Sequence, residues 1–238
     1  MNKKTQYLLL LAVLVIIVIF NLAIILTTIM DTPDNDYNVT VVGKNANGTV
    51  YKIVAGNMSS NETIGIILGV HPREHEIHEA INYTIYNITS ENGTNNLTKK
   101  YVIYYIQTKD NLTSRDDTRP AGEELAHKYV VPKIAKDEPF IVLDVHEINP
   151  DYEYSNFIFS LSNRTDEIDY YISKISTDVN LADYQFTEGT SPEKVTIPIA
   201  KKGLNTLLVE VSITDSYMQK QQTAENLIKS LDELEPYK

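Results

Sequence analysis

The sequence predicts an α/β domain with a largely parallel or mixed central sheet and helices on both faces, preceded by one N-terminal transmembrane helix. Short uninterrupted apolar segments, such as 63–70 and 140–145, alternate with stretches whose apolar residues recur at helical spacing. Strands that are apolar on both faces are typical of parallel sheets covered by helices. A block of 24 residues near the N-terminus, Tyr7–Met30, carries no charge, and it predicts the transmembrane helix.

The apolar block 7–30 is long enough to cross a membrane. At about 1.5 Å per residue it spans a hydrocarbon core of about 30 Å, whereas a signal-peptide core is usually only about 7 to 15 residues long. It also ends without a small-residue cleavage pattern. We therefore expect an uncleaved, single-pass anchor in the cell membrane.

Basic residues near the block predict its orientation. Lys3 and Lys4 precede it, and no further basic residue occurs before Lys44. The positive-inside tendency therefore places residues 1–6 in the cytoplasm and the C-terminal part outside. The polar stretch 31–36 is expected to be a short linker, followed by one extracytoplasmic domain over residues 37–238.

Glycosylation sequons support the outside placement. The chain contains ten N-x-S/T patterns, where chance predicts roughly three from the Asn, Ser and Thr content. They begin at Asn38, Asn47, Asn57, Asn61, Asn82, Asn87, Asn92, Asn96, Asn111 and Asn163. The excess is typical of an exported glycoprotein, although a compositional bias toward Asn and Thr gives the same pattern.

The elements of the domain follow from periodicity. Two β-branched segments, 37–42 and 49–54, flank a turn-prone stretch and predict a hairpin. Further strands are expected at 63–70, 101–107, 140–145, 157–161, 195–199 and 206–211. Helices are expected at 74–87, at 122–134 with entry through Pro120, at 166–179, and at 216–234 with an apolar face of Met218, Leu227, Leu231 and Leu234.

Composition excludes several classes of function. Without the first 30 residues the chain carries 19 basic and 32 acidic side chains, a formal charge of −13, which argues against a nucleic-acid partner. The chain has no cysteine, so disulfide scaffolds, cysteine nucleophiles and thiolate metal sites are excluded. Any transition metal must be held by histidine and carboxylate.

Polar residues follow three of the apolar strands. The first strand runs into His71 and Glu74, a later one into His146, and the last into Glu210. If these strands are parallel neighbours, the four side chains project at the same edge of the sheet. Two imidazoles and one carboxylate with an open position form the ligand set of a catalytic zinc site, and a further carboxylate can take a proton from water. Polar capping of the strand ends without metal is the alternative.

These motifs resemble the zinc carboxypeptidase superfamily, peptidase family M14, including its aspartoacylase and succinylglutamate desuccinylase relatives. The similarity covers about residues 60 to 215 and includes HPRE after a strand, LDVH at the end of another, and LLVEV near the C-terminus. The resemblance implies one zinc ion held by His71, Glu74 and His146, with Glu210 as the general base.

The family's substrate-carboxylate site is matched only in part. An Asn-Arg pair is usual in the family, whereas this chain has Ser114 followed by Arg115. We expect Arg115 to bind a substrate carboxylate, with Arg119 as second choice, because a guanidinium matches a carboxylate bidentately. A solvated loop arginine paired with a nearby aspartate is the alternative. No tyrosine matches the family's active-site tyrosine, and Tyr184 is only a guess.

Three other residues near the motifs have competing interpretations. His75 and His78 could replace one of the ligands, or they could lie on an ordinary helix face, since HEIH is one residue short of the HExxH zinc helix. Asp144 is expected to point away from His146, and both a structural and a supporting role stay open.

The sequence therefore predicts a membrane-anchored zinc hydrolase that cleaves a peptide or peptide-like amide near a free carboxylate. A cell-wall peptide would be an accessible substrate outside the membrane. An N-acyl amino acid deacylase would use the same site on another substrate. A surface glycoprotein that retains the fold only for binding is the third hypothesis.

Overall fold

The computed structural model describes residues 35–90, 96–112, 114–161, 164–185 and 191–238. The predicted transmembrane segment 7–30, the preceding residues 1–6 and most of the linker lie outside these ranges. Among the helices that the described residues form, none is long and apolar enough to cross a membrane. The N-terminal anchor thus stays a prediction from the sequence.

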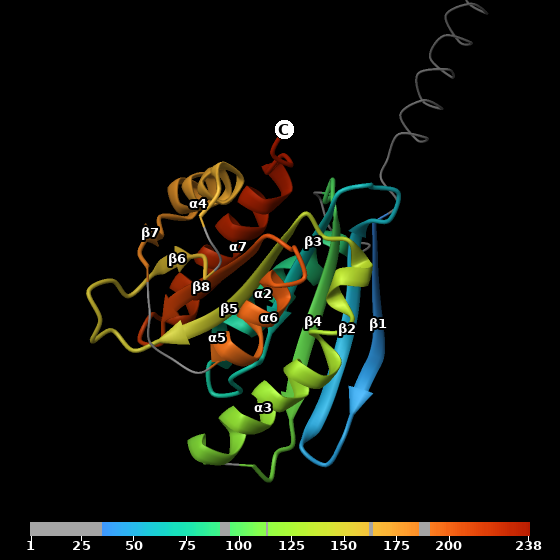
Figure 1. Ribbon diagram of the computed structural model, residues 1–238, viewed down its shortest axis with the longest axis vertical. Helices are drawn as coiled ribbons and strands as arrows, with labels where there is room; N and C mark the ends of the chain where they lie inside the picture. The colour runs from blue at the N-terminus through green and yellow to red at the C-terminus, as the bar shows by residue number, and fades with distance from the viewer. Residues whose placement is uncertain (1–34, 91–95, 113, 162–163, 186–190) are drawn as a thin grey trace, which may run out of the picture. The chain divides into compact units, whose positions relative to one another are not determined.

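The described residues form one sheet of eight strands and helices on both sides of it (Figure 1). The strands are β1 (Asn35–Lys44), β2 (Gly48–Asn57), β3 (Thr63–Leu68), β4 (Lys100–Thr108), β5 (Ile141–Ile148), β6 (Phe157–Phe159), β7 (Ala182–Asp183) and β8 (Thr206–Ser212). The helices are α2 (His75–Thr89), α3 (Arg115–Tyr129), α4 (Asp166–Val179), α5 (Ser191–Lys194), α6 (Thr196–Ala200), α7 (Tyr217–Glu233) and the 3₁₀ helix η1 (Ile134–Asp137).

The sheet is mixed, with a parallel centre. Its strand order is β1-β2-β4-β3-β5-β8-β6-β7, and the four central strands β4, β3, β5 and β8 run parallel. The predicted hairpin of β1 and β2 adds antiparallel strands beside β4, and β6 pairs antiparallel with β8. The predicted α/β class and its mixed sheet are confirmed.

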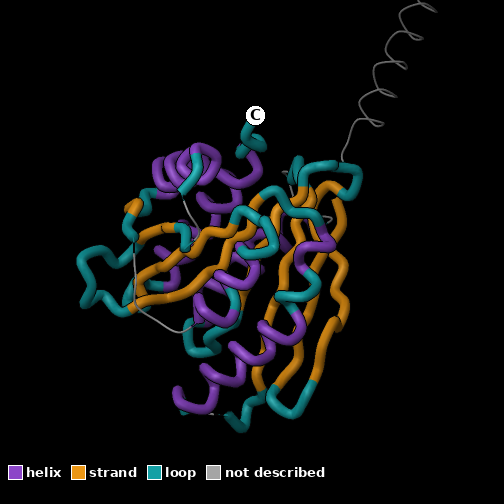
Figure 2. Tube along the Cα trace, in the orientation of Figure 1, coloured by secondary structure: helices purple, strands orange, loops and turns teal. Residues whose placement is uncertain are grey.

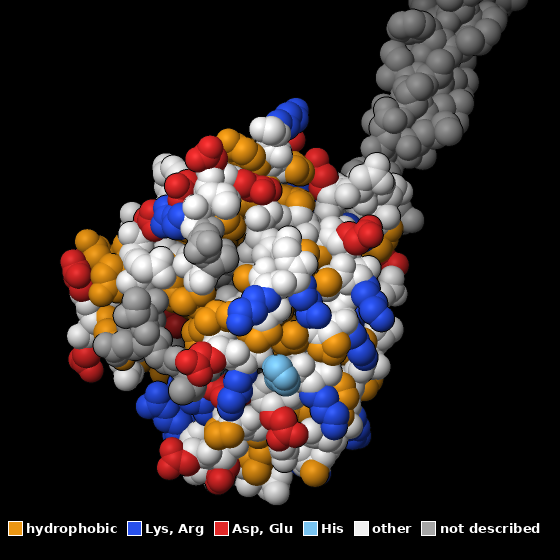
Figure 3. Space-filling model, in the orientation of Figure 1, with side chains coloured by type: hydrophobic (Ala, Val, Ile, Leu, Met, Phe, Trp, Pro, Cys, Tyr) orange, Lys and Arg blue, Asp and Glu red, His pale blue; other side chains and the backbone are white. Residues whose placement is uncertain are grey.

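Two apolar layers enclose the sheet. Helices α2, α4 and α7 pack on one face, where Ile64, Ile66 and Leu68 of β3 point (Figures 1 and 2). Helix α3, η1 and α6 cover the other face, where Ile67 points. The alternation follows from the two-residue period of a strand, and both sides are buried because helices cover both. Figure 3 shows the outer surface of the α3 side, where basic, acidic and apolar side chains are interspersed.

The connections create a switch point beside β3. The chain leaves β3 through α2 on one face to reach β4, and it returns from β4 through α3 on the other face to reach β5. In open α/β sheets, ligands bind at the carboxyl ends of strands where the connections diverge in this way. The carboxyl ends of β3 and β5 are therefore the expected place for a site.

Most predicted elements are present, with small shifts at their ends. Strand β1 begins at Asn35, so the last two residues of the predicted linker belong to the sheet. Helix α4 has the predicted bounds. On α7 the leucines of the predicted apolar face are buried, but Met218 is 81% exposed, so it does not belong to that face.

One predicted helix has different bounds, and one predicted strand was wrong. The helix expected at 122–134 begins at Arg115, because the Ser114 hydroxyl caps it by accepting from Asp117 N at 3.1 Å. It ends at Tyr129, shortly before Pro132, whose ring disfavours helical geometry in the preceding residue. The strand expected at 195–199 is the short helix α6, since Pro198 cannot donate in a sheet but fits the first turn of a helix.

Two glycines shape the segment between β3 and α2. Gly69 has a φ of +80°, and a Cβ there would lie 2.1 Å from the carbonyl oxygen of Ile106. Gly122 of α3 lies against the same segment, because a Cβ on it would lie 2.1 Å from the carbonyl oxygen of Val70. The segment that leads to His71 is thus held between β4 and α3.

We predict that Gly122→Ala destabilises the protein. In a helix with open space around it, this change stabilises by up to about 1 kcal/mol. Here the added methyl group overpacks the contact with Val70, which typically costs about 1–3 kcal/mol. Urea unfolding measures the difference, and Lys128→Ala on the exposed side of α3 serves as the control. A more stable Gly122→Ala variant would contradict the close packing.

Candidate metal centre

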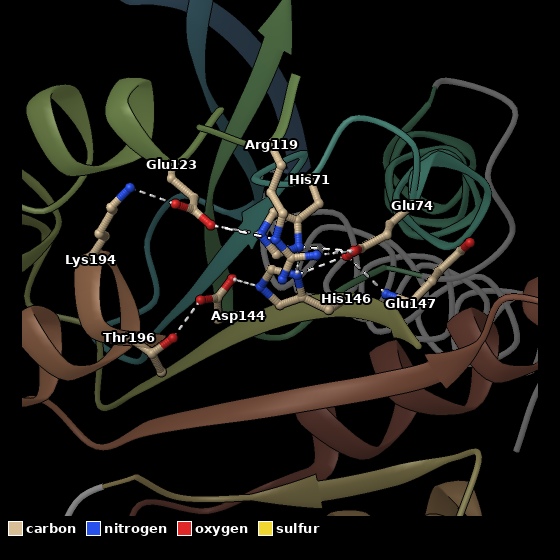
Figure 4. Close-up of polar contacts among 9 residues, drawn as sticks. All are labelled: His71, Glu74, Arg119, Glu123, Asp144, His146, Glu147, Lys194 and Thr196. Carbon is tan, nitrogen blue, oxygen red and sulfur yellow. Dashed lines mark hydrogen bonds and ion pairs between the residues drawn. The ribbon is translucent and has the colours of Figure 1, made fainter. Parts of the chain in front are cut away.

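The structure brings His71, Glu74 and His146 together at the carboxyl ends of β3 and β5. Their ligand atoms all lie within 4.8 Å of one another, and all three residues are buried (Figure 4). His71 Nδ1 lies 2.9 Å from Glu74 Oε1 and 3.1 Å from His146 Nδ1. His146 Nδ1 lies 2.9 Å from Glu74 Oε2. Two imidazole nitrogens and a carboxylate therefore face a common centre.

A carboxylate lies against the outward nitrogen of each histidine. His146 Nε2 lies 3.0 Å from Asp144 Oδ1, and His71 Nε2 lies 3.3 Å from Glu123 Oε1 (Figure 4). Metal-binding histidines commonly donate their other ring N–H to a carboxylate, which fixes the tautomer and the ring orientation. Nδ1 of each ring thus faces the centre. His146 and Asp144 are close enough for an ion pair, although His146 Nε2 and Asp144 Oδ1 make no hydrogen bond within the described residues.

These carboxylates have their own partners on the helices of the α3 side. Thr196 Oγ1 of α6 donates to Asp144 Oδ2 at 2.7 Å. Lys194 Nζ of α5 donates to Glu123 Oε2 at 2.8 Å. The orientation of the two imidazoles therefore depends on α3, α5 and α6, which lie between residues 115 and 200 of the chain.

The cluster attracts positive charge. Burial raises the pKa of Glu74, but hydrogen bonds from His146 and His71 outweigh this and hold its pKa well below the usual value. Burial lowers the pKa of His146, but Asp144 and Glu74 outweigh this and hold its pKa well above 6.5. Burial likewise raises the pKa of Glu123, whereas His71 and Lys194 lower it to about 2. Protons on the imidazoles and a divalent cation can both supply the charge that these carboxylates require.

Glu210 lies beside the cluster on β8. It is in register with His146 on β5, so the two side chains point to the same face of the sheet. Its Oε2 atom is buried and has no hydrogen-bond partner among the described residues. Burial raises the pKa of Glu210 to about 8, and the neighbouring carboxylates of Glu74 and Asp144 add to this.

A cleft of about 370 Å³ opens over these residues, and His71, Glu74 and Glu210 line it. Arg115, at the start of α3, is exposed and makes no ion pair with any residue in the described ranges. Arg119, one turn further along, already lies 3.7 Å from Glu74 Oε1 and 3.6 Å from Glu123 Oε1. The two predicted arginines thus differ, since Arg115 is free for a ligand and Arg119 balances charge in the cluster.

The alternative ligands do not join the cluster. His75 is exposed and pairs with Glu79 at 3.2 Å. His78 is fully buried, and its Nε2 lies 2.8 Å from the carbonyl oxygen of Val145. Tyr184 packs against Tyr154 and Phe157, with ring centroids 5.1 and 5.3 Å away. Tyr152, rather than Tyr184, lines the cleft.

Sequence reasoning missed part of this site. Asp144 was expected to point away from His146, but residues two apart on a strand lie on the same face, and the two side chains are in contact. Glu123 and Lys194 were not singled out, and no local pattern marks them. Glu123 lies one turn after Arg119 on α3. A helix predicted to start at Arg115 would have placed these two residues on the same helix face.

We predict that His78 makes stability depend on pH. Burial lowers its pKa to about 4, against about 6.5 in the unfolded chain. Between these values the unfolded state binds the proton that the folded state does not, so the free energy of unfolding falls as the pH falls. The full effect is about 3 kcal/mol between about pH 7 and pH 4.

His78→Gln tests this, because glutamine can still donate to Val145 but does not titrate. Urea unfolding of both proteins at the two pH values gives the difference. Between about pH 7 and pH 4, the free energy of unfolding should fall by about 3 kcal/mol more for the wild type than for the variant. Equal losses would show that His78 does not carry the dependence.

Comparisons with known proteins give the fold. A metallo-carboxypeptidase from Burkholderia cenocepacia superposes with a TM-score of 0.56 over 88% of this chain and 67% of its own, at 11% identity. An aspartoacylase family protein from Mesorhizobium loti gives 0.50 over 84% of this chain and 68% of its own, at 14% identity. A candidate metallopeptidase from Shewanella amazonensis SB2B gives 0.51 over 84% of this chain and 88% of its own, at 9% identity.

The fold is that of the metallo-carboxypeptidases. More particularly, it is the M14-like fold that carboxypeptidases share with aspartoacylases and succinylglutamate desuccinylases, as the sequence motifs predicted. No protein-family model and no curated protein sequence matches the chain. The chain spans about two thirds of the length of the Burkholderia and Mesorhizobium proteins. Activity, substrate and partners are therefore matters for proposal.

Proposed function

We propose that this protein is a zinc-dependent hydrolase that cleaves a peptide or peptide-like amide near a free carboxylate. The observation that carries the proposal is the cluster of His71, Glu74 and His146 beside Glu210, whose buried Oε2 has no partner among the described residues, next to a cleft lined by His71, Glu74 and Glu210. A role in binding alone would not require a dehydrated carboxylate beside a cluster with metal-ligand composition. Arg115, which lines the cleft, supports a substrate with a free carboxylate.

The residues present fit a zinc ion. Two histidine nitrogens and one carboxylate oxygen are the protein ligands of a catalytic zinc, and the cleft leaves the remaining side open. The carboxylates behind His71 and His146 supply the support that such ligands usually have. Zinc in this position supplies Lewis acidity that polarises a carbonyl group and promotes ionisation of water.

Each side chain then has a distinct task. Glu210 accepts a proton from the attacking water and passes it to the leaving nitrogen, for which its raised pKa of about 8 is suited. Arg115 binds the substrate carboxylate through its unpaired guanidinium. Arg119, close to Glu74 and Glu123, offsets negative charge that develops on the carbonyl oxygen.

We predict that the purified protein binds about one zinc ion and that His71→Ala or His146→Ala abolishes this binding. Glu210→Gln should retain zinc and reduce turnover about 10²- to 10⁴-fold, because only the proton acceptor is lost. Metal analysis and peptide hydrolysis measure the two effects. A metal-free wild type would overturn the proposal, and an active Glu210→Gln protein would overturn the assigned base.

We predict that Arg115→Met raises KM for substrates with a free C-terminus about tenfold or more, since charge-assisted hydrogen bonds contribute about 1.5–3 kcal/mol. Substrates with an amidated C-terminus should be little affected. Lys128→Met, at an exposed position on the same helix, is the matched control. If both substrate types respond equally to Arg115→Met, the carboxylate is bound elsewhere.

An N-acyl amino acid deacylase is the second candidate. The observation that favours it is the similarity to the Mesorhizobium loti aspartoacylase family protein, which has the same fold. Both candidates use the same metal ligands and base, so the substrate alone separates them. Hydrolysis of short peptides compared with N-acetyl and N-succinyl amino acids decides between them.

We also propose that residues 7–30 anchor the protein with its domain outside the cell membrane, where cell-wall peptides are accessible. Eight sequon asparagines lie in the described ranges, and none of them is buried, whereas Asn92 and Asn163 lie outside those ranges. Asn35 pairs with Asn57 at the end of the sheet where β3 and β4 begin, opposite the cleft. The length of β3 separates these two ends of the sheet by about 20 Å.

A further inference from the structure

Lys220 occupies an unfavourable position for a lysine. It lies in the first turn of α7, where the helix dipole disfavours a cation, and it is 0% exposed. Burying an ammonium group costs free energy unless it is paired and hydrogen-bonded. Its location therefore depends on specific partners.

Those partners connect α7 to β5 and α2. Lys220 Nζ lies 3.1 Å from Glu147 Oε1 and 2.7 Å from Glu76 Oε2, and it donates to the carbonyl oxygen of Ile213 at 3.2 Å. The Glu76 side chain is 42% exposed, whereas that of Glu147 is 1% exposed. Glu147 is thus the buried partner, and Lys220 is its only ion-pair partner among the described residues.

Glu147 lies at the junction of the two segments that carry the candidate ligands. It follows His146 on β5, and by strand alternation its side chain points to the opposite face, toward α2 and α7. Its Oε1 atom accepts from Ile77 N of α2 at 2.8 Å, one of the N–H groups that the first turn of a helix leaves free. Its own backbone N–H donates to Glu74 Oε2 at 3.2 Å.

We propose that the Lys220–Glu147 pair is a positioning device that fixes the end of β5 against the start of α2 and so sets the geometry of His146 and Glu74 for a metal ion. The inference rests on the proposed metal-dependent function. Both residues act through the ligands, Lys220 by way of Glu147. Removing Lys220 leaves the Glu147 carboxylate buried without its cation, so it moves toward water in the adjoining cleft, which it lines.

The test measures metal binding by the full chain. The variants are Lys220→Met, Glu147→Gln and the double variant, with Lys229→Met at an exposed position of α7 as the matched control. Chelator competition gives the affinity for Zn²⁺ and Co²⁺, and the visible spectrum of the Co²⁺ protein reports ligand geometry. Thermal unfolding without metal reports stability separately.

Lys220→Met should lower metal affinity about 10- to 100-fold and alter the Co²⁺ spectrum, as loss of an outer-shell contact typically does. The double variant should recover most of the affinity, because a neutral glutamine needs no cation and can still accept from Ile77. Lys229→Met should bind metal as the wild type does. If Lys220→Met fails to fold, Glu147→Gln alone decides, with an expected loss of about tenfold.

Two outcomes would overturn the inference in distinguishable ways. If Lys220→Met, or Glu147→Gln in its place, is less stable but binds metal with unchanged affinity and spectrum, the pair is only structural and the proposed function stands. If the wild type binds neither Zn²⁺ nor Co²⁺, the proposed function itself fails and the inference with it.

Discussion

The electrostatic balance around His71 and His146 is the constraint on which the rest of the structure depends. Three buried carboxylates, Glu74, Asp144 and Glu123, surround two imidazoles whose Nδ1 atoms are 3.1 Å apart. Carboxylates cannot be buried this close together without positive charge between them. The ends of β3 and β5 must therefore meet in a precise register, and the parallel pairing of these strands provides it.

The elements around the cluster are joined to it by charge as well as by apolar packing. On one face of the sheet Lys194 and Thr196 hold the carboxylates that face the outward ring nitrogens. On the other face Lys220 holds Glu147, next to His146. Buried ion pairs and hydrogen bonds restrict the side chains that make them to one geometry. The same contacts thus serve folding and the orientation of the candidate ligands.

The fold alone does not identify the substrate. Proteins with this fold include a metallo-carboxypeptidase and an aspartoacylase family protein, so the shared fold does not distinguish among amide substrates. In this chain Arg115 and Tyr152 line the cleft together with the apolar side chains of Ile148, Phe159 and Leu208.

Local sequence patterns were sufficient to predict the α/β class, the hairpin, most helices and the set formed by His71, Glu74, His146 and Glu210. Apolar periodicity is a local property, and these four residues lie at or just beyond the ends of apolar strands, where parallel pairing brings them together. The contacts of Glu123, Lys194 and Lys220 follow from the three-dimensional arrangement alone, because each depends on which helix lies beside the cluster. The three-dimensional structure also shows that α3 starts at its Ser114 cap and that the segment around Pro198 is the helix α6, where the cap and the proline outweigh the apolar pattern.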